Sequence, residues 1–167
     1  MPRPTPTRTD AEWYAAPSAG MARIHRGFKS AFAENHRLAD GTFHKYGMSL
    51  RGFLHHARAV ALSLDGHHRN EEANIFPVLA RTHPAFARSS AHVASHRVIH
   101  DGLERYNAYL DKASADPGSY NAAEFRAVID SFKEPMEKHL DQEVRDLEPS
   151  TLRLMGVTVE DLKRLPF

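Results

Sequence analysis

Four long stretches of the 167-residue chain carry apolar side chains at three- and four-residue intervals. This spacing places the apolar side chains along one face of an α-helix. No period-two run of β-branched residues indicates a strand. The helical stretches cover residues 18–39, 46–80, 90–113 and 122–147, and they are separated by glycine- and proline-containing segments at 40–42, 82–84 and 115–119.

Short connections between these helices make consecutive helices antiparallel. The predicted fold is therefore all-α, an up-down-up-down four-helix bundle over residues 18–150, with an N-terminal arm and a short C-terminal helix. The arm, residues 1–17, is rich in proline, threonine and arginine, and we expect Trp13 and Tyr14 to pack it against the bundle. In the tail, residues 151–167, Thr158 and Asp161 have the spacing of a capping box that starts a short helix.

The composition excludes several classes of protein. The absence of cysteine rules out disulfides, thiolate metal sites and cysteine nucleophiles. A net charge of +1, from 22 basic and 21 acidic side chains, predicts no nucleic-acid or membrane partner. No apolar run has the length of a signal peptide or a membrane span, so we expect a cytoplasmic protein. One count is unusual, because twelve residues are histidine, the commonest metal ligand.

Two helices repeat one histidine–glutamate pattern. His67 and Glu71 are followed by Pro77, and His139 and Glu143 are followed by Pro149 at the same distances. Residues i and i+4 project from one helix face, so each glutamate can reach across to bridge two metal ions that the histidines bind. The shifted pair, His68 and Glu72, does not have the same distance to the proline as the second copy. It also lies about 100° around the helix from the face of His67 and Glu71. We expect this pair beside the ligands or facing solvent.

The other two helices supply further candidate ligands. His96 and His100 have the i and i+4 spacing of two imidazoles on one ion, and His25 lies on the first apolar stripe. We prefer His96 and His100 over His92 and His96, because His92 falls in the first turn of its helix, near the positive end of the helix dipole. All candidates lie within about one turn of a common layer. The predicted metal ligands are His25, His67, Glu71, His96, His100, His139 and Glu143.

A metal offers the best account of this set, since burying so many imidazoles and carboxylates without one is costly. No catalytic residue is assigned. His68, Glu72 and Tyr106 are candidates for passing protons beside the metals, with a packed core phenol as the alternative for Tyr106. His36 and His56 lie eleven residues, about three turns, from His25 and His67, and we expect them to form a hydrogen-bonded pair.

The motifs resemble those of the hemerythrin-like family, also called the HHE cation-binding domain. The segments IHRGF, HHRNEEANIFPVL and HRVIHDGLERY are similar to its helix signatures, from about Met21 to Pro149. The resemblance implies two iron ions with an oxo or hydroxo bridge. It implies that His25 and His67 bind one iron, that His96, His100 and His139 bind the other, and that Glu71 and Glu143 bridge them.

The resemblance also implies an open iron position for dioxygen, peroxide, nitric oxide or azide. Oxygen-carrying members have an aspartate one residue further on than Glu143, so the chain resembles the bacterial and eukaryotic HHE type, in which oxygen transport is not the rule. Three functions stay open. They are binding or turnover of small oxidants, including catalase- or peroxidase-like activity in oxidative stress, an oxygen or iron sensor with a protein partner not identified, and an oxygenase of a small organic substrate.

Overall fold

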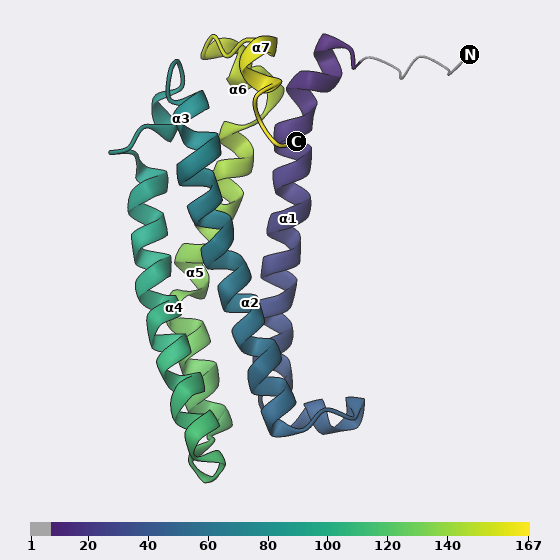
Figure 1. The fold of residues 1–167 in the computed structure, drawn as a ribbon, viewed down its shortest axis with the longest axis vertical. Coiled ribbons are helices and arrows are strands. Elements are labelled where there is room, and N and C mark those ends of the chain that lie inside the picture. Colours follow the sequence, from purple (N-terminus) through teal and green to yellow (C-terminus); the bar gives the residue numbers. More distant parts are fainter. Residues whose placement is uncertain (1–7) are drawn as a thin grey trace, which may run out of the picture.

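The structure, a computed structural model, describes residues 8–167, and these residues form helices and connecting turns with no strand. Four long helices dominate: α1 (Asp10–Leu38), α2 (Leu50–Asn70), α4 (Ala91–Ala115) and α5 (Ala122–Asp146). They lie side by side along the long axis of the molecule (Figure 1). A four-helix bundle fits this arrangement, and the predicted up-down-up-down order is compatible with it.

Shorter elements connect and cover the long helices. The turn after α1 contains the 3-10 helix η1 (Thr42–Tyr46), and η4 (Pro117–Ser119) joins α4 to α5 at the same end of the bundle (Figure 1). The π-helix η2 (Glu71–Ile75) continues α2 directly into α3 (Phe76–Leu79), and η3 (Pro84–Phe86) precedes α4. The chain ends in α6 (Pro149–Leu154) and α7 (Val159–Leu162), which lie near the start of α1. Within residues 8–167, no helix combines the length and apolar character needed to cross a membrane.

The first helix begins earlier than predicted. Residues 10–17 were expected in the arm, but Thr9 and Glu12 form a capping box that starts α1 at Asp10. Residues 1–7 of the predicted arm lie outside the described part of the chain. The expected contact of Trp13 and Tyr14 with the body is confirmed, since both pack on the cluster near α6 and α7. Thr158 and Asp161 form the predicted capping box of α7.

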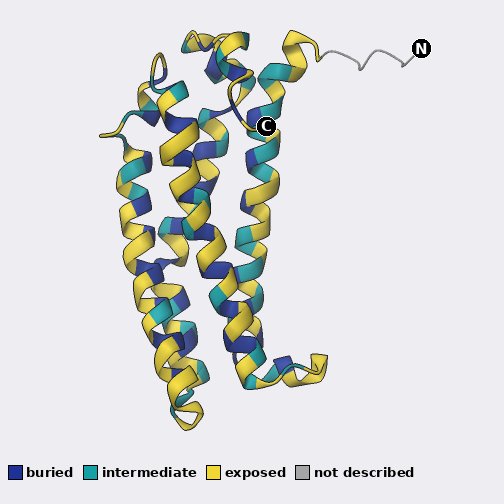
Figure 2. Ribbon diagram, in the orientation of Figure 1, coloured by how far each residue is buried: buried dark blue, intermediate teal, exposed yellow. Residues whose placement is uncertain are grey.

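The interior consists of two apolar clusters with a polar layer between them. The larger cluster fills the bundle from Phe32 and Leu64 toward η1, and the smaller joins Met21 and Ile75 to α6 and α7. His25 lies between Met21 and Phe32 on α1, and the corresponding layer is polar on the other long helices. Figure 2 shows buried residues on the inward sides of the helices and exposed residues outside. This packing holds the polar layer away from solvent.

Candidate metal centre

The polar layer receives side chains from all four long helices. α1 supplies His25, and α2 with the first residue of η2 supplies His67, His68 and Glu71. α4 supplies His96, and α5 supplies His139 and Glu143. One nitrogen or oxygen from each of His68, Glu71, His96 and His139 lies within 4.8 Å of the others, and the same holds for His25, His67 and Glu71. Glu71 therefore belongs to both groups.

A π-helical turn places Glu71 at a change in helix geometry. The N–H of Glu71 still bonds to the carbonyl of His67 in α-helical register, whereas the N–H of Phe76 reaches back five residues to the carbonyl of Glu71. Pro77 has no N–H to continue an α-helical ladder, and its ring would crowd the carbonyl four residues earlier. The wider turn accommodates the proline, and such turns are frequent at functional sites.

His25 and His67 form the first imidazole pair. Their Nε2 atoms are 3.0 Å apart, and Nδ1 of His25 donates to the carbonyl of Leu140 at 2.8 Å. A ring whose Nδ1 carries the proton presents an unprotonated Nε2 to the interior. The backbone of α5 therefore sets the orientation of His25 as a ligand.

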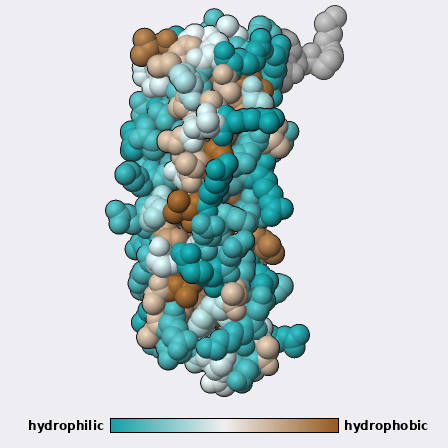
Figure 3. All heavy atoms as spheres, turned by 90° about the vertical axis from the view of Figure 1, so that its left-hand side faces the viewer, coloured by the Kyte–Doolittle hydropathy of each residue, from teal (hydrophilic) through white to brown (hydrophobic). Residues whose placement is uncertain are grey.

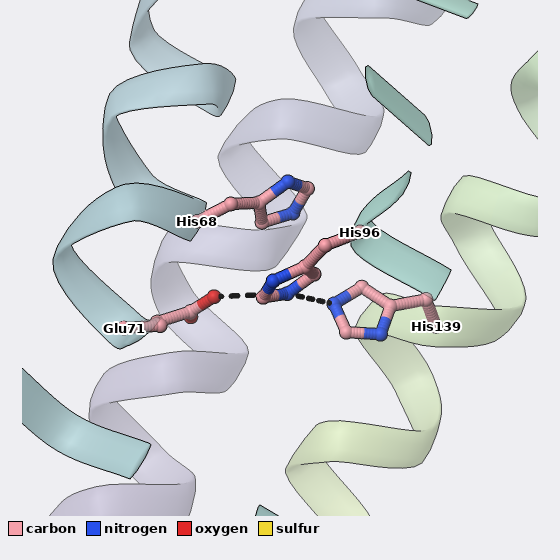
Figure 4. Close-up of side chains that lie close together, drawn as sticks. All are labelled: His68, Glu71, His96 and His139. Carbon is pink, nitrogen blue, oxygen red and sulfur yellow. Dashed lines mark hydrogen bonds and ion pairs between the residues drawn. The ribbon is translucent and has the colours of Figure 1, made fainter. Parts of the chain in front are cut away.

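His96 and His139 form the second pair, again with 3.0 Å between their Nε2 atoms. Figure 4 shows both rings converging with Glu71, while His68 lies over His96. The His68 and His96 rings stack with centroids 4.0 Å apart. Burial lowers the pKa of His68 to about 2 and that of His139 to about 3. Both rings are therefore neutral near pH 7, the state in which imidazole binds metal.

Two buried carboxylates lie between the imidazole pairs. Glu71 and Glu143 are 0% exposed, and none of their four oxygens has a hydrogen bond of normal geometry. Burial opposes ionisation of Glu71, but the neighbouring His25, His67 and His96 rings outweigh it and hold its pKa well below the usual value. Burial and the negative charge on Glu71 raise the pKa of Glu143 well above its usual value.

The donor set fits cations. In each imidazole pair the two Nε2 atoms lie 3.0 Å apart, close enough for both nitrogens to bind one ion. Buried carboxylate oxygens without hydrogen bonds are rare in proteins unless a charge compensates them. Imidazole and carboxylate together suit iron, manganese or zinc.

The structure does not bring His100 into this layer. Its side chain is 49% exposed and lies 3.4 Å from Asp65 and 3.5 Å from Glu104. The buried face of α4 contains Ile99, Leu103 and Tyr106, and it is centred on the His92 side of His96. His100 is turned about 40° from His96 in the opposite direction and points outward.

His92, which is not among the predicted ligands, occupies the buried side instead. Its exposed fraction is 3%, and its ring centroid lies 5.4 Å from that of His139. Its Nε2 lies 3.0 Å from Oδ2 of Asp146. Phe86 and α5 cover the first turn of α4, so His92 is buried although it lies near the loop and the positive end of the helix dipole.

His68 also lies deeper than expected. α2 packs against both α1 and α4. Two adjacent residues differ by about 100° around the helix, so His67 faces α1 while His68 faces α4. The adjacent histidines in the sequence were the signal for this arrangement. Glu72 is the predicted neighbour of the ligands, and its Oε1 lies 2.7 Å from Nδ1 of His96.

Tyr106 is not beside the layer. It lies ten residues, about 15 Å, along α4 from His96 and packs in the larger apolar cluster. Its hydroxyl accepts from Asn35 and donates to the carbonyl of Ala57. Burial raises its pKa well above the usual value, so it remains a core phenol and its proposed part in proton transfer is wrong.

The predicted hydrogen bond between His36 and His56 is also wrong. Nε2 of His36 lies 3.3 Å from Oδ2 of Asp130 on α5, and His56 is exposed. The α5 carboxylate is the nearer partner because α1 packs closely along α5.

Comparisons with known proteins agree with the geometry. The family model of the hemerythrin HHE cation-binding domain matches residues 16–150. The chain is similar to dimeric xanthone biosynthesis cluster protein R11 of Cryptosporiopsis sp. (strain 8999), with 34% identity over 112 residues. That match covers 67% of this chain and 40% of the length of the relative. No solved structure matches the chain significantly. The chain belongs to the hemerythrin HHE cation-binding domain family.

Proposed function

We propose that the polar layer holds two iron ions with an oxo or hydroxo bridge, and that the centre binds or turns over a small oxidant. His25 and His67 would hold one ion, and His96 and His139 the other. Glu71 and Glu143 would lie between them. When bound, such a pair of ions supplies Lewis acidity and reversible oxidation at a position open to dioxygen, hydrogen peroxide or nitric oxide.

The placement of Glu71 carries this proposal. Its Oε1 lies 2.7 Å from Nε2 of His67, and its Oε2 lies 3.4 Å from Nε2 of His96. One carboxylate thus presents one oxygen to each imidazole pair, which is what a bridging ligand requires. Oε2 of Glu143 lies 3.7 Å from Nε2 of His25 and 3.6 Å from Nε2 of His139, so it also falls between the pairs.

The surrounding residues set the properties of the centre. The Leu140 carbonyl orients His25 through its Nδ1 atom, and Glu72 orients His96 through its Nδ1 atom. The apolar clusters on both sides exclude bulk water and strengthen electrostatic interactions within the layer. With two carboxylates, rather than the four of the Glu-x-x-His di-iron bundles, the centre is electron-poor. This favours chemistry at the level of peroxide over attack on unactivated C–H bonds.

Iron per chain, with the absorption spectrum before and after azide or hydrogen peroxide, tests the proposal. We expect two irons per chain, a spectrum that responds to both azide and hydrogen peroxide, and faster loss of peroxide than in buffer. His67→Ala should lower the iron content toward one per chain. One zinc per chain, or no bound metal, would contradict the di-iron model. If the protein contains stoichiometric iron but peroxide disappears no faster than in buffer, the centre binds oxidants without turning over peroxide.

The name of the Cryptosporiopsis relative, a biosynthesis cluster protein, favours a second candidate, oxidation of a small organic substrate within a biosynthetic route. The same iron-loaded protein separates the two candidates. Oxidant consumption without an organic substrate supports the first, whereas consumption that depends on an added substrate supports the second.

A further inference from the structure

A cavity of about 550 Å³ lies beside the polar layer, where η2 and α3 meet the start of α4. Its walls are mainly apolar and are formed by Phe76, Pro77, Ala80, Phe86 and Val93. The two phenylalanines are 3% and 1% exposed and pack with their ring centroids 5.3 Å apart. A volume and lining of this kind are typical of sites for small organic ligands.

Two arginines stand at the polar side of the cavity. Arg88 and Arg97 line it, and neither guanidinium forms a hydrogen bond or ion pair with any residue of the described range 8–167. The third charged residue of the lining, Glu72, is already engaged with Nδ1 of His96 at 2.7 Å. The cavity therefore offers two unpaired positive charges next to apolar walls.

The cavity approaches the metal centre through one aromatic ring. Phe76 stacks on His96 with a centroid distance of 5.4 Å and an angle of 19° between the rings. A second cavity, of about 350 Å³, shares Glu72, Val93 and Arg97 with the first and is also lined by His68 and His96. A ligand held against Phe76 would thus lie one ring away from His96.

The surface around the cavity favours a small ligand over a protein partner. Figure 3 views the molecule from the side that carries α4, and hydrophobic residues there lie in separate places among hydrophilic ones. No broad apolar patch of the kind that binds proteins is seen on this face.

We propose that this cavity binds an aryl carboxylate. The planar guanidinium groups of Arg88 and Arg97 match a carboxylate, with which arginine forms paired hydrogen bonds. Pro77, Ala80 and Val93, which are only partly buried or exposed, provide an apolar contact surface for an aromatic body, above the buried rings of Phe76 and Phe86. This inference goes beyond the proposed function, because the site uses no metal ligand and can be occupied whether or not iron is bound.

Calorimetric titration of the full chain with 2-naphthoate tests the proposal, with the neutral 2-naphthalenemethanol as the matched ligand. We expect the naphthoate to bind at least about tenfold more tightly than the alcohol. The double variant Arg88→Gln/Arg97→Gln should remove this preference while keeping iron content and the melting temperature. Val93→Trp, which fills the cavity, should weaken both ligands.

Arg51→Gln is the control, since Arg51 is exposed at the start of α2, remote from the cavity. It should bind both ligands as the wild type does. No binding at millimolar naphthoate, equal affinity for acid and alcohol, or an equal loss in the Arg51 variant would overturn the proposal. None of these outcomes depends on iron loading, so failure here is distinguishable from failure of the di-iron proposal.

Discussion

Oε1 of Glu72 lies 2.7 Å from Nδ1 of His96, and this contact leaves Nε2 of the ring directed at His139. Glu72 is half exposed, whereas His96 is buried. A carboxylate at the surface therefore fixes the orientation of a ring in the interior. Partners of this kind fix the tautomer of a ligand histidine and raise its basicity.

Glu72→Ala should weaken metal binding by about 10- to 100-fold, because His96 loses the group that orients it. The measurement is competition with a chromogenic chelator. Glu104→Ala removes another exposed carboxylate, on α4 itself, and should leave the metal affinity unchanged. Equal affinity in both variants would show that the contact with His96 does not matter for the metal.

His100→Ala should retain the full metal content, since the His100 ring is half exposed and directed toward Asp65 and Glu104. His96→Ala should lose metal, because His96 lies within the buried group. Metal analysis of the two purified variants provides the comparison. Loss of one ion in His100→Ala would show that His100 is a metal ligand, against its position in the structure.

The metal-free protein should lose stability as the pH falls from 6.5 toward 4.5. Burial lowers the pKa of His68 to about 2 and of His139 to about 3, so only the unfolded chain takes up these protons in that range. Each group then removes about 1.4 kcal/mol per pH unit from the free energy of unfolding. Glu143 has a raised pKa, so the folded protein takes up its proton at a higher pH than the unfolded chain does. Its protonation therefore adds to the free energy of unfolding as the pH falls. Burial also lowers the pKa of His92, so three histidines act against one carboxyl group and the metal-free protein loses stability on acidification. Denaturant titration at several pH values measures this loss.

Glu143→Gln isolates the contribution of the Glu143 carboxyl group to the pH dependence of stability. A glutamine has a similar shape and no proton to release, so the metal-free variant should be more stable than the metal-free wild type at pH 7. Its stability should also fall more steeply on acidification, since the opposing contribution is gone. Iron content should drop, because an amide cannot act as an anionic ligand. A variant less stable than the wild type at pH 7 would contradict the raised pKa.

Gly102→Ala should destabilise the bundle by about 1–3 kcal/mol. A Cβ on Gly102 would lie 2.6 Å from Cγ of Phe132, where α4 packs closely on α5. Gly27→Ala on α1 is the matched control, because nothing lies within 4 Å of its added Cβ. That change should stabilise the protein by about 0.5–1 kcal/mol through helix propensity. Thermal melts of the two variants should therefore shift in opposite directions.

Local sequence determined the helices and much of the polar layer. Apolar spacing predicted the four long helices, and a capping box at Thr158 predicted α7. The capping box of Thr9 and Glu12 starts α1 eight residues before the predicted bound at residue 18. The repeated His-x-x-x-Glu pairs indicated His67 with Glu71 and His139 with Glu143, because i and i+4 share a face in any α-helix.

Only the packing of the helices decided which side of each ligand face is buried. His92 and His100 lie at equal spacing from His96, so the spacing of the histidines alone does not distinguish them, although the apolar stripe of Ile99, Leu103 and Tyr106 is centred on the His92 side. The position of α5 against α4 buries His92 and leaves His100 in solvent. The two neighbours of α2 likewise bring His68 into the layer, against expectation. Sequence periodicity fixes angles within one helix, whereas burial depends on where the other helices stand around it.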